Sequence, residues 1–227
     1  MARRERKRYE TTDLLIAVLI KLLRKEVNYL DVLGFDELSA PKITSLTKSM
    51  VIRLLKANKS AYIKIATAAS KEAVEDIKEL SGIAVRPIKT DEAFVTGVLA
   101  EYNPVTGYLY EAEADRKRAR LAEALITTVL VGLRADYHKE LVKFSNLWHT
   151  QTLQYAETMV DKARVETFKK NGIRRVRWEA EDDSRTCHEC KERDGKIYSI
   201  DDIPVKPHYR CRCWLTPVLE KQGFSSS

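Results

Sequence analysis

Apolar residues in the first 170 positions recur at intervals of three and four residues, which places them on one face of an α-helix. The first apolar stripe lies between Thr12 and Val32. Thr11 or Thr12 is suited to cap its start, and Gly34 to stand just beyond its end. The members of the stripe are Leu14, Leu15, Val18, Leu19, Leu22 and Leu23. The pattern therefore predicts an amphipathic helix over residues 12–32.

The same periodicity continues along the chain and predicts several more helices. The second is expected to begin at Ser39, with Pro41 in its first turn, and to run for up to thirty residues. Because Arg86 precedes a proline, residues 83–88 are expected to form an extended connector. Further helices are expected over residues 71–80, from Asp91 to Tyr102, from Tyr108 to about Val131 and, as one or two long helices, over residues 135–170.

After Gly172 the period changes from that of a helix to that of a strand. Val176 and Trp178 alternate with Arg175 and Arg177, which is typical of a half-buried strand. Residues 196–200 and 211–218 are predicted to form two more short strands. The expected fold class is therefore mainly α, an elongated helical body followed by a small C-terminal α+β module.

Charge is unevenly distributed along the 227 residues, which carry a formal net charge of +7. Residues 1–8 contain five basic residues and one acidic residue, so the start of the chain is a basic tail. Such a tail suits contact with nucleic acid or simply solvation. No apolar run reaches the length of a membrane span, and none follows the basic start as in a signal peptide. A soluble, intracellular chain is expected.

Catalytic motifs are missing from the sequence. It has no glycine-rich phosphate loop, no G-x-S-x-G elbow and no H-E-x-x-H pair. Asp183 is expected to cap a turn or hold Arg185, and His138 and His149 are interpreted as ordinary helix residues. We therefore expect a protein that is not an enzyme.

All four cysteines lie within the last quarter of the chain, in the pattern Cys187-x-x-Cys190 and then His208-x-x-Cys211-x-Cys213. Paired soft ligands at two short spacings are typical of a structural zinc site, because each tight turn aims two ligand atoms at one point. Two disulfides, or ordinary buried thiols, are the alternatives. A catalytic zinc is disfavoured, since such a site leaves one position open for water and here the candidate ligands are in excess.

Five candidate ligands compete for four positions around the metal. Cys187, Cys190 and Cys211 are the first choices, and His208 and Cys213 compete for the remaining place. His188, inside the first pair, is interpreted as a bystander. A segment of this size has too little core to fold alone, and a metal ion is one remedy. We divide the chain into a basic tail (1–11), a helical body (12–172), a zinc-binding module (173–219) and a flexible tail (220–227).

The same segment resembles the C-terminal domain of a known protein family. The shared features are Trp178, then Asp183 before Arg185-Thr186-Cys187-x-x-Cys190, then Asp194-Gly195, then Pro207-His208-x-x-Cys211-Arg212-Cys213. In this order they resemble the minor head proteins of tailed phages, the head-morphogenesis family that includes protein F of phage Mu. The resemblance is specific over residues 173–217 and weak in the helix before them.

The resemblance implies a structural component of the virion. A protein of this family is expected in the head interior or at the portal vertex, and in the host cytoplasm during assembly. Its implied partners are the portal protein or the major capsid protein, with roles in head morphogenesis and DNA delivery. Packaged DNA is a further candidate partner, through the basic N-terminal tail, and no membrane partner is expected.

Two other functions are compatible with the residues. The first is a zinc-dependent nucleic-acid-binding module whose phosphate-facing patch comprises Arg174, Arg175, Arg177, Arg210 and Arg212. The second is a nuclease of the treble-clef type, which would need His188 or His208 as a general base beside a catalytic metal.

Overall fold

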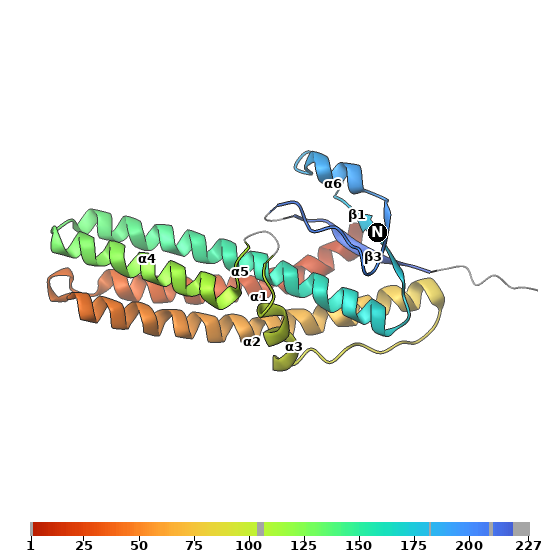
Figure 1. The fold of residues 1–227 in the computed structure, drawn as a ribbon, viewed down its shortest axis with the longest axis horizontal. Helices are drawn as coiled ribbons and strands as arrows, with labels where there is room; N and C mark the ends of the chain where they lie inside the picture. Colours follow the sequence, from red (N-terminus) through yellow and green to blue (C-terminus); the bar gives the residue numbers. More distant parts are fainter. Residues whose placement is uncertain (1, 104–106, 182, 209–210, 220–227) are drawn as a thin grey trace, which may run out of the picture.

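Four long helices run side by side along one axis, and the C-terminal module sits on one end of them (Figure 1). This computed structural model describes residues 2–103, 107–181, 183–208 and 211–219, with side chains described from Thr12 onward. The expected flexible tail at 220–227 lies outside the described residues, as do the side chains of the basic tail. The fold is mainly α with a small three-stranded sheet, as the sequence predicts.

The helical body contains five α-helices and one short 3-10 turn among the described residues. The helix α1 is followed by the turn η1, and the long helix α2 comes next. A short helix, α3, packs against α2 and α5 beside the main bundle. The bounds are α1 Ala2–Val32, η1 Phe35–Glu37, α2 Ala40–Ser81, α3 Glu92–Leu99, α4 Tyr110–Leu130 and α5 Arg134–Lys170.

Two predicted helix boundaries are wrong. The first helix begins at Ala2, not at a cap formed by Thr11 or Thr12. Residues 2–11 contain no glycine or proline and are rich in good helix formers, so the helix extends through them. The predicted break before residue 71 is also absent, because α2 is continuous to Ser81 and ends at Gly82, whose φ of 69° is left-handed.

The continuity of α2 has a packing reason. Ala66 and Ala69 are buried against Ala163 of α5, so small residues let the two helices approach closely. Beside them, the hydroxyls of Ser70 and Thr167 share a hydrogen bond of 2.7 Å between the same two helices. Tertiary packing therefore holds a stretch whose serine and threonine content lowers its own helix propensity.

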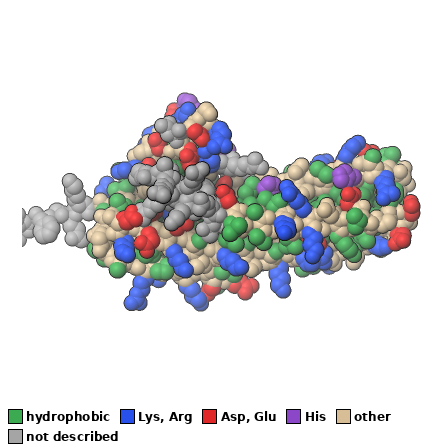
Figure 2. Space-filling model, turned by 180° about the vertical axis from the view of Figure 1, so that it is seen from behind, with side chains coloured by type: hydrophobic (Ala, Val, Ile, Leu, Met, Phe, Trp, Pro, Cys, Tyr) green, Lys and Arg blue, Asp and Glu red, His purple; other side chains and the backbone are tan. Residues whose placement is uncertain are grey.

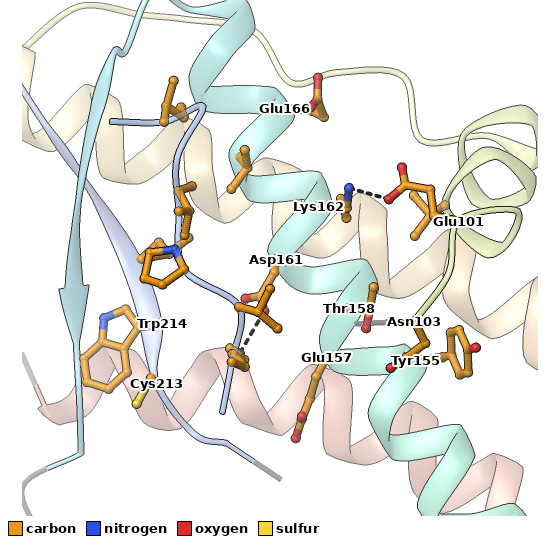
Figure 3. Close-up of a pocket in the computed structure, with 18 of the residues that line it drawn as sticks. Glu101, Asn103, Tyr155, Glu157, Thr158, Asp161, Lys162, Glu166, Cys213 and Trp214 are labelled. Atoms are coloured by element: carbon orange, nitrogen blue, oxygen red, sulfur yellow. Dashed lines mark hydrogen bonds and ion pairs between the residues drawn. The ribbon is translucent and has the colours of Figure 1, made fainter. Parts of the chain in front are cut away.

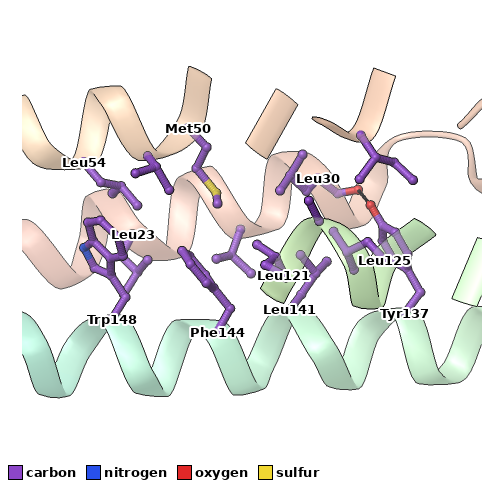
Figure 4. Packing of buried hydrophobic residues seen from close by; sticks show 14 of the residues in the cluster. Leu23, Leu30, Met50, Leu54, Leu121, Leu125, Tyr137, Leu141, Phe144 and Trp148 are labelled. Atoms are coloured by element: carbon purple, nitrogen blue, oxygen red, sulfur yellow. Dashed lines mark hydrogen bonds between the residues drawn. The ribbon is translucent and has the colours of Figure 1, made fainter. Parts of the chain in front are cut away.

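The core of the bundle lies between α1, α2, α4 and α5 (Figure 4). Trp148 and Phe144 of α5 stack in its centre, with ring centroids 5.6 Å apart. At the far end, the hydroxyl of Tyr137 donates a hydrogen bond of 3.1 Å to the main-chain oxygen of Leu30, joining α5 to α1. The other labelled members of this core are Leu23, Met50, Leu54, Leu121, Leu125 and Leu141.

The module is built on an antiparallel sheet of strand order β2-β1-β3. The strands are β1 Arg175–Glu179, β2 Ile197–Ser199 and β3 Trp214–Val218, close to the predicted ranges. A helix not predicted from the sequence, α6 His188–Arg193, lies between β1 and β2. In register, Val176 faces both Tyr198 of β2 and Pro217 of β3.

The module shares a hydrophobic core with the ends of α2 and α5. Ala73 and Ile77 of α2 and Phe168 of α5 pack against the buried face of the sheet. Val176 and Trp178 of β1 point into this core, and the alternating Arg175 and Arg177 are exposed, as the two-residue period predicts. On the face seen in Figure 2, basic side chains are scattered among acidic and apolar ones along the helical body.

Candidate metal centre

The first Cys pair is arranged by the start of α6. Cys187 is the N-cap residue of this helix, and its Sγ accepts a hydrogen bond of 3.4 Å from the backbone N–H of Cys190. One turn of helix therefore brings the two sulfurs to the same side. The cap explains the local fold of the Cys-x-x-Cys sequence, since a sulfur acceptor satisfies one of the free N–H groups at the helix start.

The other three candidate ligands, His208, Cys211 and Cys213, lie in the segment that leads into β3. His208 places its Nε2 3.1 Å from the Sγ of Cys187 and 4.0 Å from the Sγ of Cys190. The Sγ of Cys211 lies 3.5 Å from the Sγ of Cys190. The five predicted ligands therefore converge, in two overlapping groups that share Cys190: Cys187, Cys190 and His208, and Cys190, Cys211 and Cys213.

These separations fit a tetrahedral metal ion. Two thiolates, each about 2.3 Å from a tetrahedral zinc, are about 3.8 Å apart. The sulfur–sulfur distance between Cys190 and Cys211, 3.5 Å, lies near this value. The two distances from the Nε2 of His208 to sulfur are 3.1 and 4.0 Å, and an imidazole nitrogen sits slightly closer to zinc than a thiolate does. A small cavity of about 20 Å³ adjoins the site and is lined by Cys187, His208 and Cys213. The side chains can therefore hold a metal ion, and sulfur with imidazole is a donor set that suits zinc.

Burial and thiol chemistry point the same way. Cys190, Cys211 and Cys213 are buried, whereas Cys187 and His208 are half-buried. Burial raises the pKa of the Cys190 thiol to about 12. A hydrogen bond with Cys213, together with burial, raises the pKa of Cys211 above its ordinary value. Thiols of this kind stay protonated at neutral pH unless a cation stabilises the thiolates.

Cys187 differs from the other two. Burial acts to raise its pKa, but hydrogen bonds from Cys190 and His208 outweigh burial and hold the pKa below its ordinary value. All four cysteines are free thiols, so the structure does not adopt the disulfide alternative. Cys187 is therefore the thiol most easily converted to the thiolate that binds a metal.

A salt bridge braces the site from outside. Both terminal guanidinium nitrogens of Arg212 donate to the carboxylate of Asp183, at 2.7 and 2.6 Å. Asp183 also accepts a hydrogen bond of 2.9 Å from the backbone N–H of Arg185, as expected for a turn-capping residue. The expected side-chain contact with Arg185 is longer, at 3.3 Å, so Arg212 is the main partner. Asp183 thus ties the segment of Cys211 and Cys213, just before β3, to the turn before Cys187.

The remaining predicted residues take the following places. The side chain of His188 is 86% exposed and lies 3.7 Å from Glu192, which confirms that it points away from the cysteines. Arg174, Arg175 and Arg177 are exposed, Arg212 is held by Asp183, and Arg210 lies outside the described residues. His138 and His149 both lie in α5, and His138 contacts Asp31 at 2.9 Å.

Sequence reasoning missed Arg164, a charged residue buried where the module meets the helical body. Its side chain is 2% exposed and lies 2.5 Å from the carboxylate of Asp76 in α2. Nothing in the local sequence indicates that Arg164 of α5 pairs with Asp76 of α2, because the two residues are 88 positions apart. The contact is evident only in the folded chain, where Arg164 and Asp76 are both buried.

Fold and site together define a mainly helical protein that carries a small β module with a Cys/His cluster. Residues 132–216 match the family model described as "Phage Mu protein F like protein", so this part of the chain is similar to that family. The match covers α5 and nearly the whole module, so it extends beyond the segment whose motifs carry the resemblance. No curated protein and no solved structure matches the chain.

The family match supports a structural protein of phage head morphogenesis, and with it a place in the virion among other virion proteins. Among the described residues, none of the helices has the length and apolar character needed to cross a membrane.

Proposed function

We propose that the chain is a minor head protein of a tailed phage, located in the head interior at the portal vertex and acting in head assembly. The observation that carries the proposal is the family match over residues 132–216, which covers the long helix α5 and the Cys/His module as one unit. Its contacts are with the portal protein or the major capsid protein. The basic start of the chain is the part suited to contact packaged DNA and to influence its delivery.

Within this function, we assign a structural zinc ion to Cys187, Cys190, His208 and Cys211. Cys-x-x-Cys and His-x-x-Cys have the same spacing. His208 lies close to both Cys187 and Cys190, and Cys211 lies close to Cys190, the residue shared by the two groups. A zinc ion with four protein ligands supplies folding energy and no open position for chemistry. Cys213 is the adjoining thiol, hydrogen-bonded to Cys211 and placed immediately before β3.

The metal ties together parts of the module that have little regular structure. It would join the start of α6 to the segment entering β3, and the sheet then presents its apolar face to Phe168 and Ile77. We propose residues 173–219 as the module and residues up to 172 as the body. The module depends on both the metal and the bundle, because its own three strands bury little area.

Mass spectrometry of purified heads tests the proposal. Heads assembled from the phage that encodes this chain should contain it in low copy number, and chemical cross-links should join it to the portal protein or the major capsid protein. Complete heads that lack the chain, formed at normal yield when its gene is deleted, would refute the proposal.

A second candidate, zinc-dependent binding of nucleic acid, rests on the exposed Arg174, Arg175 and Arg177 beside the Cys/His cluster. Binding to duplex DNA that falls with salt and is lost in Arg175→Glu/Arg177→Glu would favour it. Loss only on deletion of residues 1–8 would instead make the basic tail the contact. The nuclease alternative is not carried further, because His208 faces Cys187 and His188 is a surface residue.

A further inference from the structure

A cleft of about 430 Å³ lies between one side of the module and the helical body, beside the core that the two parts share. One wall is α5, from Gln154 to Lys169, and a second is the segment that follows α3, from Glu101 to Asn103. The third wall is formed by residues 200–206 of the module together with the start of β3 (Figure 3). The volume lies in the range of ordinary ligand pockets, enough for a few side chains of a bound segment.

The inner surface of the cleft is apolar but carries polar atoms without partners. Tyr155, Trp178, Trp214 and Leu215 supply ring and aliphatic surface. Two polar atoms here, the Oε1 of Gln154 and the Nε1 of Trp178, are buried and have no hydrogen-bond partner among the described residues. Both side chains are at least 95% buried. Because buried polar groups are normally paired, these atoms leave one acceptor and one donor unsatisfied in the lining of the cleft.

The charge of the lining is acidic. It contains five carboxylates and three lysines, which leaves an excess of two negative charges; the carboxylates are Glu101, Glu157, Asp161, Glu166 and Asp201. Each lysine already faces one of them: Lys162 to Glu101 at 2.6 Å, Lys169 to Asp201 at 2.8 Å and Lys206 to Asp161 at 2.9 Å.

We propose that this cleft binds a basic segment of a partner protein, in which an apolar side chain is flanked by arginine or lysine. The apolar side chain would occupy the ring-lined interior. The flanking cations would lie against the acidic rim, where Glu166 is exposed, and guanidinium or main-chain groups would meet the acceptor of Gln154. A nucleic acid would bring phosphates against an acidic surface, which is electrostatically unfavourable. The proposal does not depend on the virion assignment.

The module wall of the cleft is connected to the metal centre. Arg193 of α6 donates a hydrogen bond of 2.7 Å to the main-chain oxygen of Val205, and its guanidinium lies over the ring of Trp178. Lys206 precedes His208 by two residues, and Cys213 lines both the cleft and the small cavity beside the cysteines. The shape of the cleft therefore depends on the folded module.

Binding of a designed peptide to the zinc-loaded full chain tests the proposal. The probe is acetyl-Arg-Arg-Leu-Arg-Arg-amide, and the readout is tryptophan fluorescence, since Trp178 and Trp214 line the cleft whereas Trp148 lies in the bundle core. We expect saturable binding that weakens as NaCl is raised from about 50 to about 500 mM. Glu166→Lys should raise the dissociation constant by roughly 3- to 30-fold.

The matched control is Glu123→Lys, which makes the same charge change at an exposed position of α4 outside the cleft. It should leave binding within about twofold of the original chain. Equal binding of a peptide with glutamine in place of every arginine would overturn the proposal. So would equal weakening in both variants, or no binding of the basic probe.

Discussion

The guanidinium of Arg164, on α5, donates a hydrogen bond of 2.8 Å to the main-chain oxygen of Leu215, on β3. The same group contacts Asp76 of α2, so one buried cation joins two helices of the body to the edge strand of the module. Pro217, two residues on, has no N–H to offer on that edge. Both features protect β3 from pairing with another chain, a common need of edge strands.

Removing this cation should be costly. Arg164→Met would leave the carboxylate of Asp76, which is 8% exposed at its side chain, without its cation. We expect the free energy of unfolding to fall by about 3–5 kcal/mol, measured by urea denaturation. The double variant Arg164→Met/Asp76→Leu should recover most of that loss, because no buried charge remains. If the double variant is no more stable than Arg164→Met, the loss of stability does not come from an unpaired Asp76 carboxylate.

The pair of Asp183 and Arg212 is expected to make the stability of the module depend on pH in acid. The hydrogen bonds from Arg212 hold the pKa of Asp183 well below its usual range. Because the folded-state pKa is depressed, the contribution of this pair is present above the unfolded pKa of about 3.9 and is lost as pH falls below it. Asp183→Asn should remove that part of the acid dependence. Melting temperatures of the original chain and the variant between pH 3 and pH 6 measure the difference. An identical pH profile in the variant would contradict this prediction.

The titration of Tyr137 is expected to lower the stability of the fold in alkali. Burial, aided by the nearby Asp31, raises the pKa of its hydroxyl to about 12. A raised folded-state pKa means that the stabilisation is complete below the unfolded pKa of about 10 and declines as pH rises above it. Tyr137→Phe should cost about 1 kcal/mol at pH 7 through the lost bond to Leu30, and this deficit should shrink between pH 10 and 12. A constant deficit over that range would show that Tyr137 does not titrate as expected.

How far the sequence predicted the structure depends on the range of the interactions. Apolar periodicity and local breakers such as Gly82 and Gly172 predicted the helices and the change to strands, since those signals act within a few residues. For the same reason, the Cys-x-x-Cys spacing predicted that Cys187 and Cys190 lie together. That the second group joins them followed from the ligand chemistry of zinc and not from a local signal. The contacts of Arg164 and the uninterrupted course of α2 through Ser70 depend on α5, about 90 residues away, and no local pattern encodes them.

The helix α6 was missed for a different reason. It has six residues and buries only Cys190, so it shows no apolar stripe. Its start depends on the sulfur of Cys187 acting as a cap acceptor, a role usually filled by serine, threonine, aspartate or asparagine. The cleft could not be predicted either, because its walls come from three segments that meet only in the folded chain.

Loss of one ligand should unfold the module and leave the bundle largely intact. In Cys190→Ser, limited proteolysis should cut within residues 180–213, whereas the helical circular dichroism of α1, α2, α4 and α5 should fall only slightly, because their main core lies apart from the module. The control is Ser199→Ala, an exposed change in β2. Full protection of the module in Cys190→Ser would contradict the role given to the metal.

Zinc content of the purified, reduced chain tests the central claim most directly. We expect one zinc per chain by elemental mass spectrometry, lost in Cys187→Ser, Cys190→Ser and Cys211→Ser and retained in Cys213→Ser. Loss in Cys213→Ser with retention in His208→Ala would move the fourth ligand from His208 to Cys213. A reduced chain without metal whose module resists proteolysis as the zinc-loaded chain does would contradict the claim that a metal ion holds the module together.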